Sequence, residues 1–160
     1  MQILLLRHGD ALDSLDYATR ALSPVGSEQA KIAGTVLNSL LLIPELILTS
    51  PLQRAVQTAL IVADLAGVKD ITATEYLTSG SDHRQILQQL NDLRRERILL
   101  VGHEPHLSIL ISLVVTGIRT SRIEMRKGSL AFCESEIPVG PSSGILRWIL
   151  PPEVSTRLSR

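Results

Sequence analysis

The chain has 160 residues, of which 44% are hydrophobic and 20% charged, with 16 basic and 16 acidic side chains. This composition is typical of one globular domain over residues 1–160, and a net charge of zero with only 2% aromatic residues argues against a protein that binds nucleic acid. The apolar runs are shorter than the ~18 residues that span a membrane, and the first residues lack the pattern of a secretory leader, so we expect a cytoplasmic protein without a membrane partner.

The first predicted element is an apolar strand over residues 3–6 that runs into Arg7-His8-Gly9. A short apolar run that stops at polar residues is typical of a buried strand in a parallel sheet. In open α/β sheets, ligands bind at the carboxyl ends of the strands. A later strand over residues 98–101 ends in the same way at Gly102-His103, so we predict one shared site.

Two Ser-Pro pairs mark the starts of the first two predicted helices, because serine caps a helix and proline suits its first turn. Ser23-Pro24 opens a helix of about 18 residues, and Ser50-Pro51 opens another that ends at Gly67. Apolar residues recur at helical spacing in both segments, and a short strand over residues 45–49 lies between them.

The rest of the chain continues the alternation of strands and helices. The further predicted elements are a strand over residues 70–74, a helix over residues 82–93, a helix from Pro105 to Gly117, and strands over residues 129–134 and 145–150. The last two strands are expected to pair antiparallel at a sheet edge, and the polar tail after Pro152 is expected to fray. This order predicts an α/β fold, a three-layer sandwich whose mostly parallel central sheet has helices on both faces.

The polar residues at these strand and helix ends have the chemistry of a phosphate site. Arginine supplies fixed charge and a planar fork of donors, which Arg7 and Arg54 offer here. A neutral imidazole can attack phosphorus, and Gly9 lets a phosphoryl group come close to His8. A protonated His103 would stabilise the charge on the phosphoryl oxygens.

Three segments carry a resemblance to a known family: Arg7-His8-Gly9, residues 50–58 with the sequence Ser-Pro-Leu-Gln-Arg-Ala-Val-Gln-Thr, and Gly102-His103. In this order they resemble the signatures of the histidine phosphatase superfamily, which includes the cofactor-dependent phosphoglycerate mutases and acid phosphatases. The resemblance covers residues 1 to about 117. Within the superfamily, the chain is most similar to the short, SixA-type phosphohistidine phosphatases. The likeness lies in the opening segment, in residues 20–26, and in the lack of the long insertion after residue 74 where larger relatives carry a lid.

The resemblance implies a metal-independent phosphatase, without a cofactor, that forms a covalent phosphohistidine on His8. Arg7, Arg54 and His103 would form the phosphate pocket, and Arg20 would be an added phosphate ligand. The substrate would be phosphohistidine on a protein, such as a histidine phosphotransfer domain, because an open site suits a side chain that another domain presents.

The sequence leaves the proton donor for the leaving group open. The three candidate carboxylates are Asp16, Glu75 and Asp82. We expect that a phosphorus–nitrogen bond requires a weaker acid than a phosphate ester, because imidazole nitrogen is easier to expel.

Three alternative functions also remain open. The chain would also suit a small-molecule phosphomonoesterase, or a module that binds phosphohistidine without turnover. His103 and His106 form a His-x-x-His pair that would suit a metal hydrolase, although no convincing third ligand accompanies them. We interpret His106 instead as a residue of the pocket rim or a helix cap, and His83 as a surface residue near a helix start.

Overall fold

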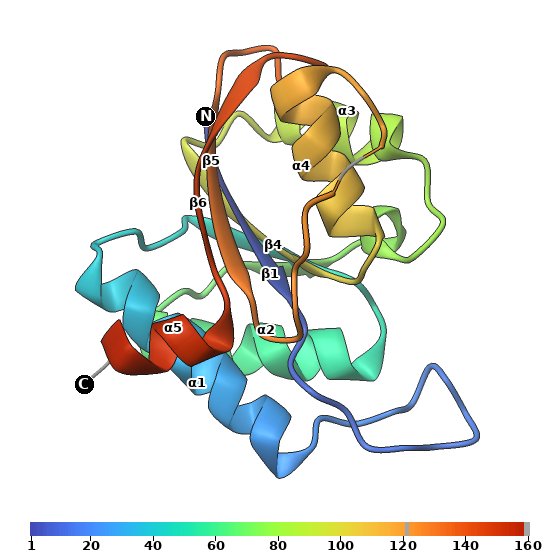
Figure 1. The fold of residues 1–160 in the computed structure, drawn as a ribbon, viewed down its shortest axis with the longest axis vertical. Helices are drawn as coiled ribbons and strands as arrows, with labels where there is room; N and C mark the ends of the chain where they lie inside the picture. Colours follow the sequence, from blue (N-terminus) through green and yellow to red (C-terminus); the bar gives the residue numbers. More distant parts are fainter. Residues whose placement is uncertain (121, 159–160) are drawn as a thin grey trace.

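The computed structural model describes residues 1–120 and 122–158, which are built on a central six-stranded sheet (Figure 1). The strands are β1 (Gln2–Arg7), β2 (Leu46–Thr49), β3 (Ile71–Ala73), β4 (Arg97–Gly102), β5 (Leu130–Ser135) and β6 (Gly144–Leu150). Their order across the sheet is β3-β2-β4-β1-β5-β6. The first four in that order are mutually parallel, whereas β5 pairs antiparallel with both β1 and β6. The predicted α/β class with an antiparallel edge near the C-terminus is confirmed.

Helices cover both faces of the sheet (Figure 1). They are α1 (Pro24–Ser39), α2 (Gln53–Ala66), α3 (His83–Leu93), α4 (His106–Thr116), α5 (Pro152–Leu158) and the short 3₁₀ turn η1 (Glu75–Leu77). One apolar core joins the sheet to α1 and α2, and the other joins it to α3, α4 and η1. Leu4 and Leu6 of β1 belong to the first core, and Ile3 and Leu5 belong to the second.

The central strands are apolar at almost every position because helices bury both of their faces. Each leucine removed from water in this way contributes about 1.5–3 kcal/mol to folding. The parallel register of β1 and β4 pairs Arg7 with Gly102, so these two strands end at the same level. The polar residues that follow them are therefore brought to one edge of the sheet.

Two predictions were wrong: the state of the C-terminal tail and the residue at which the second helix begins. The tail after Pro152 forms α5, which packs against α1, so packing holds a segment that was expected to fray. The last two residues of that tail, 159–160, lie outside the described residues. The second helix begins at Gln53, and its N-cap residue Leu52 makes no side-chain cap bond, so Ser50 has another role.

In the described part of the chain, no helix is both long and apolar enough to cross a membrane.

Candidate active site

The carboxyl ends of β1 and β4 bring two imidazole rings together. The backbone N–H of His8 donates to the carbonyl of Gly102, 3.0 Å away, which continues the pairing of the two strands beyond Arg7. The ring centroids of His8 and His103 lie 4.9 Å apart, with the ring planes tilted by 57°. The two histidines that were predicted to share one site at the strand ends therefore lie next to each other.

Hydrogen bonds define the state of the His8 ring. Its Nδ1 lies 2.6 Å from the carbonyl of Gly9, which can only accept, so Nδ1 carries the proton. Nε2 is then the nitrogen with the free lone pair, and it accepts from Nε of Arg54 at 3.3 Å. Burial, together with the charges of Arg54 and Arg7, lowers the pKa of His8 to about 4. The ring is therefore neutral near pH 7, as a nucleophile must be.

Arg54 is only 2% exposed, and its contacts explain how a charge is held at this depth. The guanidinium lies over the ring of Tyr17, 4.2 Å from its centroid, and Nη1 donates to the Tyr17 carbonyl at 2.8 Å. One turn later, Thr58 donates to the Arg54 carbonyl and accepts from the backbone N–H of Gly9. Thr58, the last residue of the 50–58 segment, thus ties α2 to the residue after His8.

Two buried nitrogens at the site have no hydrogen-bond partner within the protein: Nδ1 of His103 and Nε of Arg7. Nε2 of His103 lies 2.8 Å from the hydroxyl of Ser50, and Nη1 of Arg7 donates to the carbonyl of Met125. Burial, together with the nearby charge of Arg54, lowers the pKa of His103 to about 3, so the ring is neutral near pH 7 and not in the protonated form considered from the sequence. Buried polar nitrogens are normally paired, so these two favour an anionic ligand as their partner.

A pocket of about 150 Å³ opens over the two rings. Its lining consists of Arg7, His8, Ala11, Tyr17, Arg20, Arg54, His103, Glu104 and Lys127. Four of these nine side chains are cationic, which suits a phosphoryl group. A larger cavity of about 830 Å³ lies at the opposite ends of β1 and β4, but it contains none of the site histidines and two of its three arginines, Arg95 and Arg97, are held by protein groups. The smaller pocket is therefore the candidate active site.

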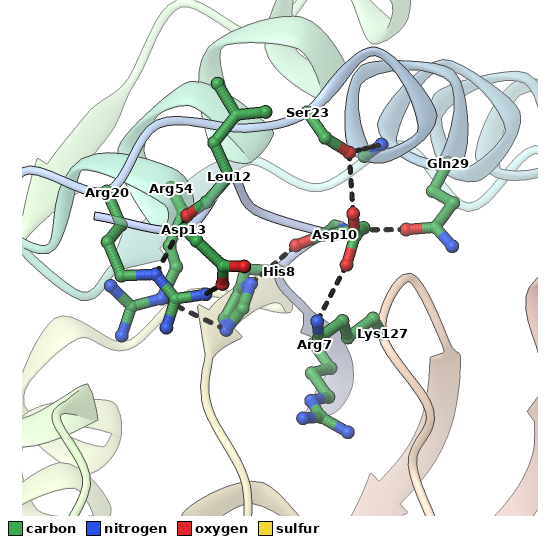
Figure 2. Close-up of polar contacts among 12 residues, drawn as sticks. Arg7, His8, Asp10, Leu12, Asp13, Arg20, Ser23, Gln29, Arg54 and Lys127 are labelled. Carbon is green, nitrogen blue, oxygen red and sulfur yellow. Dashed lines mark hydrogen bonds and ion pairs between the residues drawn. The ribbon is translucent and has the colours of Figure 1, made fainter. Parts of the chain in front are cut away.

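The loop after β1 is fastened on both sides of His8 (Figure 2). On one side Asp10 accepts from Lys127 at 2.7 Å and from Ser23, which also caps α1. On the other side Arg20 donates from Nε to the carbonyl of Leu12 and lines the pocket together with Arg54. Asp10 therefore orients the loop.

The backbone of this loop also meets α1 directly. A Cβ added to Gly9 would overlap the backbone of Gly26, and one added to Gly26 would overlap the backbone of Asp10. Two chain segments can approach this closely only where both lack side chains.

None of the three carboxylates considered from sequence lines the pocket. Asp16 is exposed and accepts from the backbone N–H of Ala18, and Glu75 is exposed on η1. Asp82 caps α3. Glu104 was missed, although it directly follows His103 at the same sheet edge and lines the pocket. Burial raises its pKa, and its carboxylate accepts from the backbone N–H of Ser108.

The other two histidines form a separate pair. His83 is buried, so its interpretation as a surface residue was wrong, and His106 is buried rather than at the rim. Their rings stack with centroids 4.0 Å apart, and Nε2 of His83 donates to the His106 carbonyl at 2.9 Å. The described residues hold no group of three or more side chains suited to a metal ion. The alternative metal site on His103 and His106 therefore still lacks a third ligand in this part of the chain.

This arrangement defines an α/β enzyme with two histidines and several arginines around an anion pocket. The profile of the histidine phosphatase superfamily (branch 1) matches residues 3–78. An uncharacterized protein of Picosynechococcus is 30% identical over 136 residues, which cover 81% of this chain and 82% of that protein. The chain belongs to the histidine phosphatase superfamily, and it is a phosphatase of that superfamily.

Solved structures share the fold over nearly the whole chain. A structure of the protein histidine phosphatase SixA complexed with tungstate is 24% identical, with a TM-score of 0.86 and coverage of 95% of this chain and 97% of that one. A putative alpha-ribazole-5'-P phosphatase from Escherichia coli is 20% identical, with a TM-score of 0.77 and coverage of 96% and 98%. The fold is thus similar to that of phosphatases described with protein and with small-molecule substrates.

Proposed function

We propose that this phosphatase hydrolyses phosphohistidine on another protein, through a phosphoryl group carried transiently by Nε2 of His8. The observation that carries the proposal is the neutral His8 ring beneath a small cationic pocket, with Nδ1 protonated against the Gly9 carbonyl and the lone pair of Nε2 directed at Arg54. Neutral imidazole nucleophiles of this kind form covalent phosphoryl intermediates.

In the first step, the lone pair on Nε2 of His8 attacks phosphorus. The bond between phosphorus and the substrate imidazole nitrogen breaks, and its electron pair stays on that nitrogen, which takes up a proton. The guanidinium of Arg54 now touches Nε2, and on substrate binding it turns to a phosphoryl oxygen. Arg54, Arg7 and His103 stabilise the negative charge on the transferred group.

Glu104 is the group we propose as the proton donor. It lines the pocket, and its raised pKa favours the protonated form that an acid needs. In the second step a water molecule attacks phosphorus, its proton passes to the Glu104 carboxylate, and the bond to Nε2 breaks. Phosphate leaves and His8 returns to its neutral form, so the cycle closes with one water consumed.

The size of the pocket favours a protein substrate. Sites that enclose small molecules usually measure about 300–1,000 Å³ and bury most of the ligand. The pocket here has about 150 Å³, which suits a phosphoryl group and leaves the remainder of the substrate outside. A small-molecule phosphomonoester is the second candidate, supported by the likeness to the Escherichia coli protein described as a putative alpha-ribazole-5'-P phosphatase.

The test is a single-turnover experiment with a histidine phosphotransfer domain labelled on its phosphohistidine. We expect label to appear on the wild-type phosphatase, to be absent from His8→Ala, and to be released as phosphate. Alkyl phosphates should react at least about a hundredfold more slowly, because they expel a poorer leaving group. Equal rates on both substrates would favour the small-molecule candidate, and tight binding without any label would favour a binding module.

A separate variant tests the acid. Glu104→Gln keeps the size of the side chain and its ability to accept from Ser108, but it cannot supply a proton. We expect about a hundredfold slower turnover, with the pH dependence of kcat flattened. Asp82→Asn, which alters a carboxylate away from the pocket, is the matched control. Unchanged turnover in Glu104→Gln would remove this residue from the mechanism.

A further inference from the structure

Three exposed apolar side chains lie on the loop between β1 and α1, close to the mouth of the pocket. Leu12 is 51% exposed, Tyr17 is 55% exposed, and Leu15 projects fully into solvent. Single exposed apolar residues are common, but three within six residues beside a catalytic pocket point to a binding surface. We infer that this segment, residues 12–17, is the docking surface for the protein that carries the phosphohistidine. The inference rests on the proposed function.

Hydrogen bonds fix the backbone on both flanks of the loop. The N–H of Leu12 donates to the carbonyl of Ala21, and the N–H of Gln53 donates to the carbonyl of Ala18. Arg20 adds a bond to the Leu12 carbonyl and an ion pair to Asp13. Figure 1 shows that the loop stands off from the sheet and helices. Because both flanks of the loop are fixed, Leu12 and Leu15 remain available to a partner.

Tyr17 makes the pocket and the docking surface continuous. Its ring covers the guanidinium of Arg54, its carbonyl accepts from the same group, and it lines the pocket. A partner that inserts a phosphohistidine therefore meets Tyr17 first and the two leucines next to it.

The chemistry of the surface defines the partner. The phosphoryl dianion is complementary to the cationic pocket, where Arg7, Arg20, Arg54 and Lys127 outnumber the carboxylate of Glu104. Segment 12–17 exposes Asp13 and Asp16 between its apolar side chains, so the surface around the modified histidine must combine apolar groups with basic ones. The occupant is therefore a folded protein that presents phosphohistidine within a patch of apolar and basic side chains, which a small phosphate compound does not provide.

The test separates docking from chemistry by using two substrates with the same phosphorus–nitrogen bond. The double variant Leu12→Gln with Leu15→Gln leaves the lining of the pocket untouched. We expect kcat/KM on a phosphorylated histidine phosphotransfer domain to fall about tenfold or more, since apolar contacts at the interface are lost, while hydrolysis of phosphoimidazole stays unchanged. Leu60→Gln is the matched control, because Leu60 is 52% exposed on α2.

The outcomes distinguish this inference from the function on which it rests. If the wild type hydrolyses the phosphoprotein and the double variant does so equally well, the docking surface is refuted and the proposed function stands. If the variant loses activity on both substrates alike, the loop supports the pocket and does not recognise a partner. If the wild type hydrolyses phosphoimidazole but no phosphoprotein, both proposals fail.

Discussion

The molecule contains two buried histidine pairs that look alike until their surroundings are compared. His8 and His103 lie at the carboxyl ends of β1 and β4, and His83 and His106 lie at the starts of α3 and α4. All four rings are buried, and burial is the largest cause of the lowered pKa in every case. Burial and a lowered pKa are therefore not sufficient to define a catalytic site in this protein.

What separates the pairs is the cationic pocket that the first pair lines. His83 and His106 stack nearly parallel, and His83 uses both ring nitrogens on protein groups, the His106 carbonyl and Arg119. Nδ1 of His103 and both ring nitrogens of His106 are buried without a hydrogen-bond partner, so an unpartnered nitrogen does not by itself distinguish the pairs. The first pair is tilted and lines the pocket together with Arg7 and Arg54, so its unpartnered nitrogen can meet an anionic substrate there.

The largest expected difference in activity between the two pairs comes from substituting the first histidine of each, His8 and His83. We expect His8→Ala to lower kcat/KM at least about a thousandfold, because the proposed nucleophile is lost, and His83→Gln to lower it less than about threefold. Steady-state kinetics on a phosphohistidine protein, with circular dichroism as the check on folding, measures both. A large loss in folded His83→Gln would mean that the second pair takes part in catalysis.

The comparison becomes sharper at His103 and His106, which lie three residues apart in sequence. His103→Gln removes a ring that lines the pocket and that we propose contacts the phosphoryl oxygens, so it should cost about a hundredfold in kcat. His106→Gln should leave kcat nearly unchanged and lower the free energy of unfolding instead, since a buried stacked ring is replaced. Denaturant unfolding beside kinetics separates the two effects, and similar kinetic losses in both variants would contradict the distinction.

Acid should destabilise the protein through both pairs. His8 and His106 have folded-state pKa values of about 4, below the ordinary 6.5, so the unfolded chain binds more protons between these values. The contribution of these imidazoles to the free energy of unfolding is therefore fully present above pH 6.5 and is lost as the pH drops to about 4. At pH 5 each of them has lowered the free energy of unfolding by about 2 kcal/mol. Urea unfolding at pH 7 and pH 5 tests this, and His106→Gln should lose its own share of the pH dependence. Equal free energies of unfolding of the wild type at both pH values would show that burial does not lower the pKa of these imidazoles.

The smallest expected effect concerns Ser50, whose side chain contacts His103 of the first pair. Its hydroxyl lies 2.8 Å from Nε2 of His103 and thereby sets which ring nitrogen faces the pocket. Ser50→Ala should lower kcat about tenfold and leave KM nearly unchanged, because the ring loses its orientation. Ser112→Ala removes a buried hydroxyl that donates to the Thr120 carbonyl, and serves as the control. If both variants lose activity equally, the effect is one of packing.

The sequence allowed most of the fold and the centre of the site to be predicted because both depend on local patterns. Apolar runs ending at Arg7-His8 and Gly102-His103 marked the strand ends, and parallel strands bring such ends to one edge. Glu104 was within reach of the same reasoning, since it follows His103 directly. Asp16, Glu75 and Asp82, the carboxylates that the sequence offered as candidate acids, do not line the pocket.

The remaining features depend on contacts between distant parts of the chain. Ser50 reads as a helix cap until β4 brings His103 to it, and Tyr17 has no signal until Arg54 lies beneath its ring. The burial of His83 follows from its stacking on His106, which no periodicity reveals. α5 is a seven-residue helix, too short to be stable alone, so its formation depends on packing against α1.

The direct backbone contact between Gly9 and Gly26 has a consequence for laboratory evolution of this enzyme. A library that randomises every position around the pocket would recover changes at residues whose side chains meet a substrate, because these can be exchanged one at a time. Neither glycine has a side chain to offer a substrate, yet any replacement pushes the first turn of α1 away from the segment that carries His8. Selected clones should therefore retain both glycines whatever substrate is imposed.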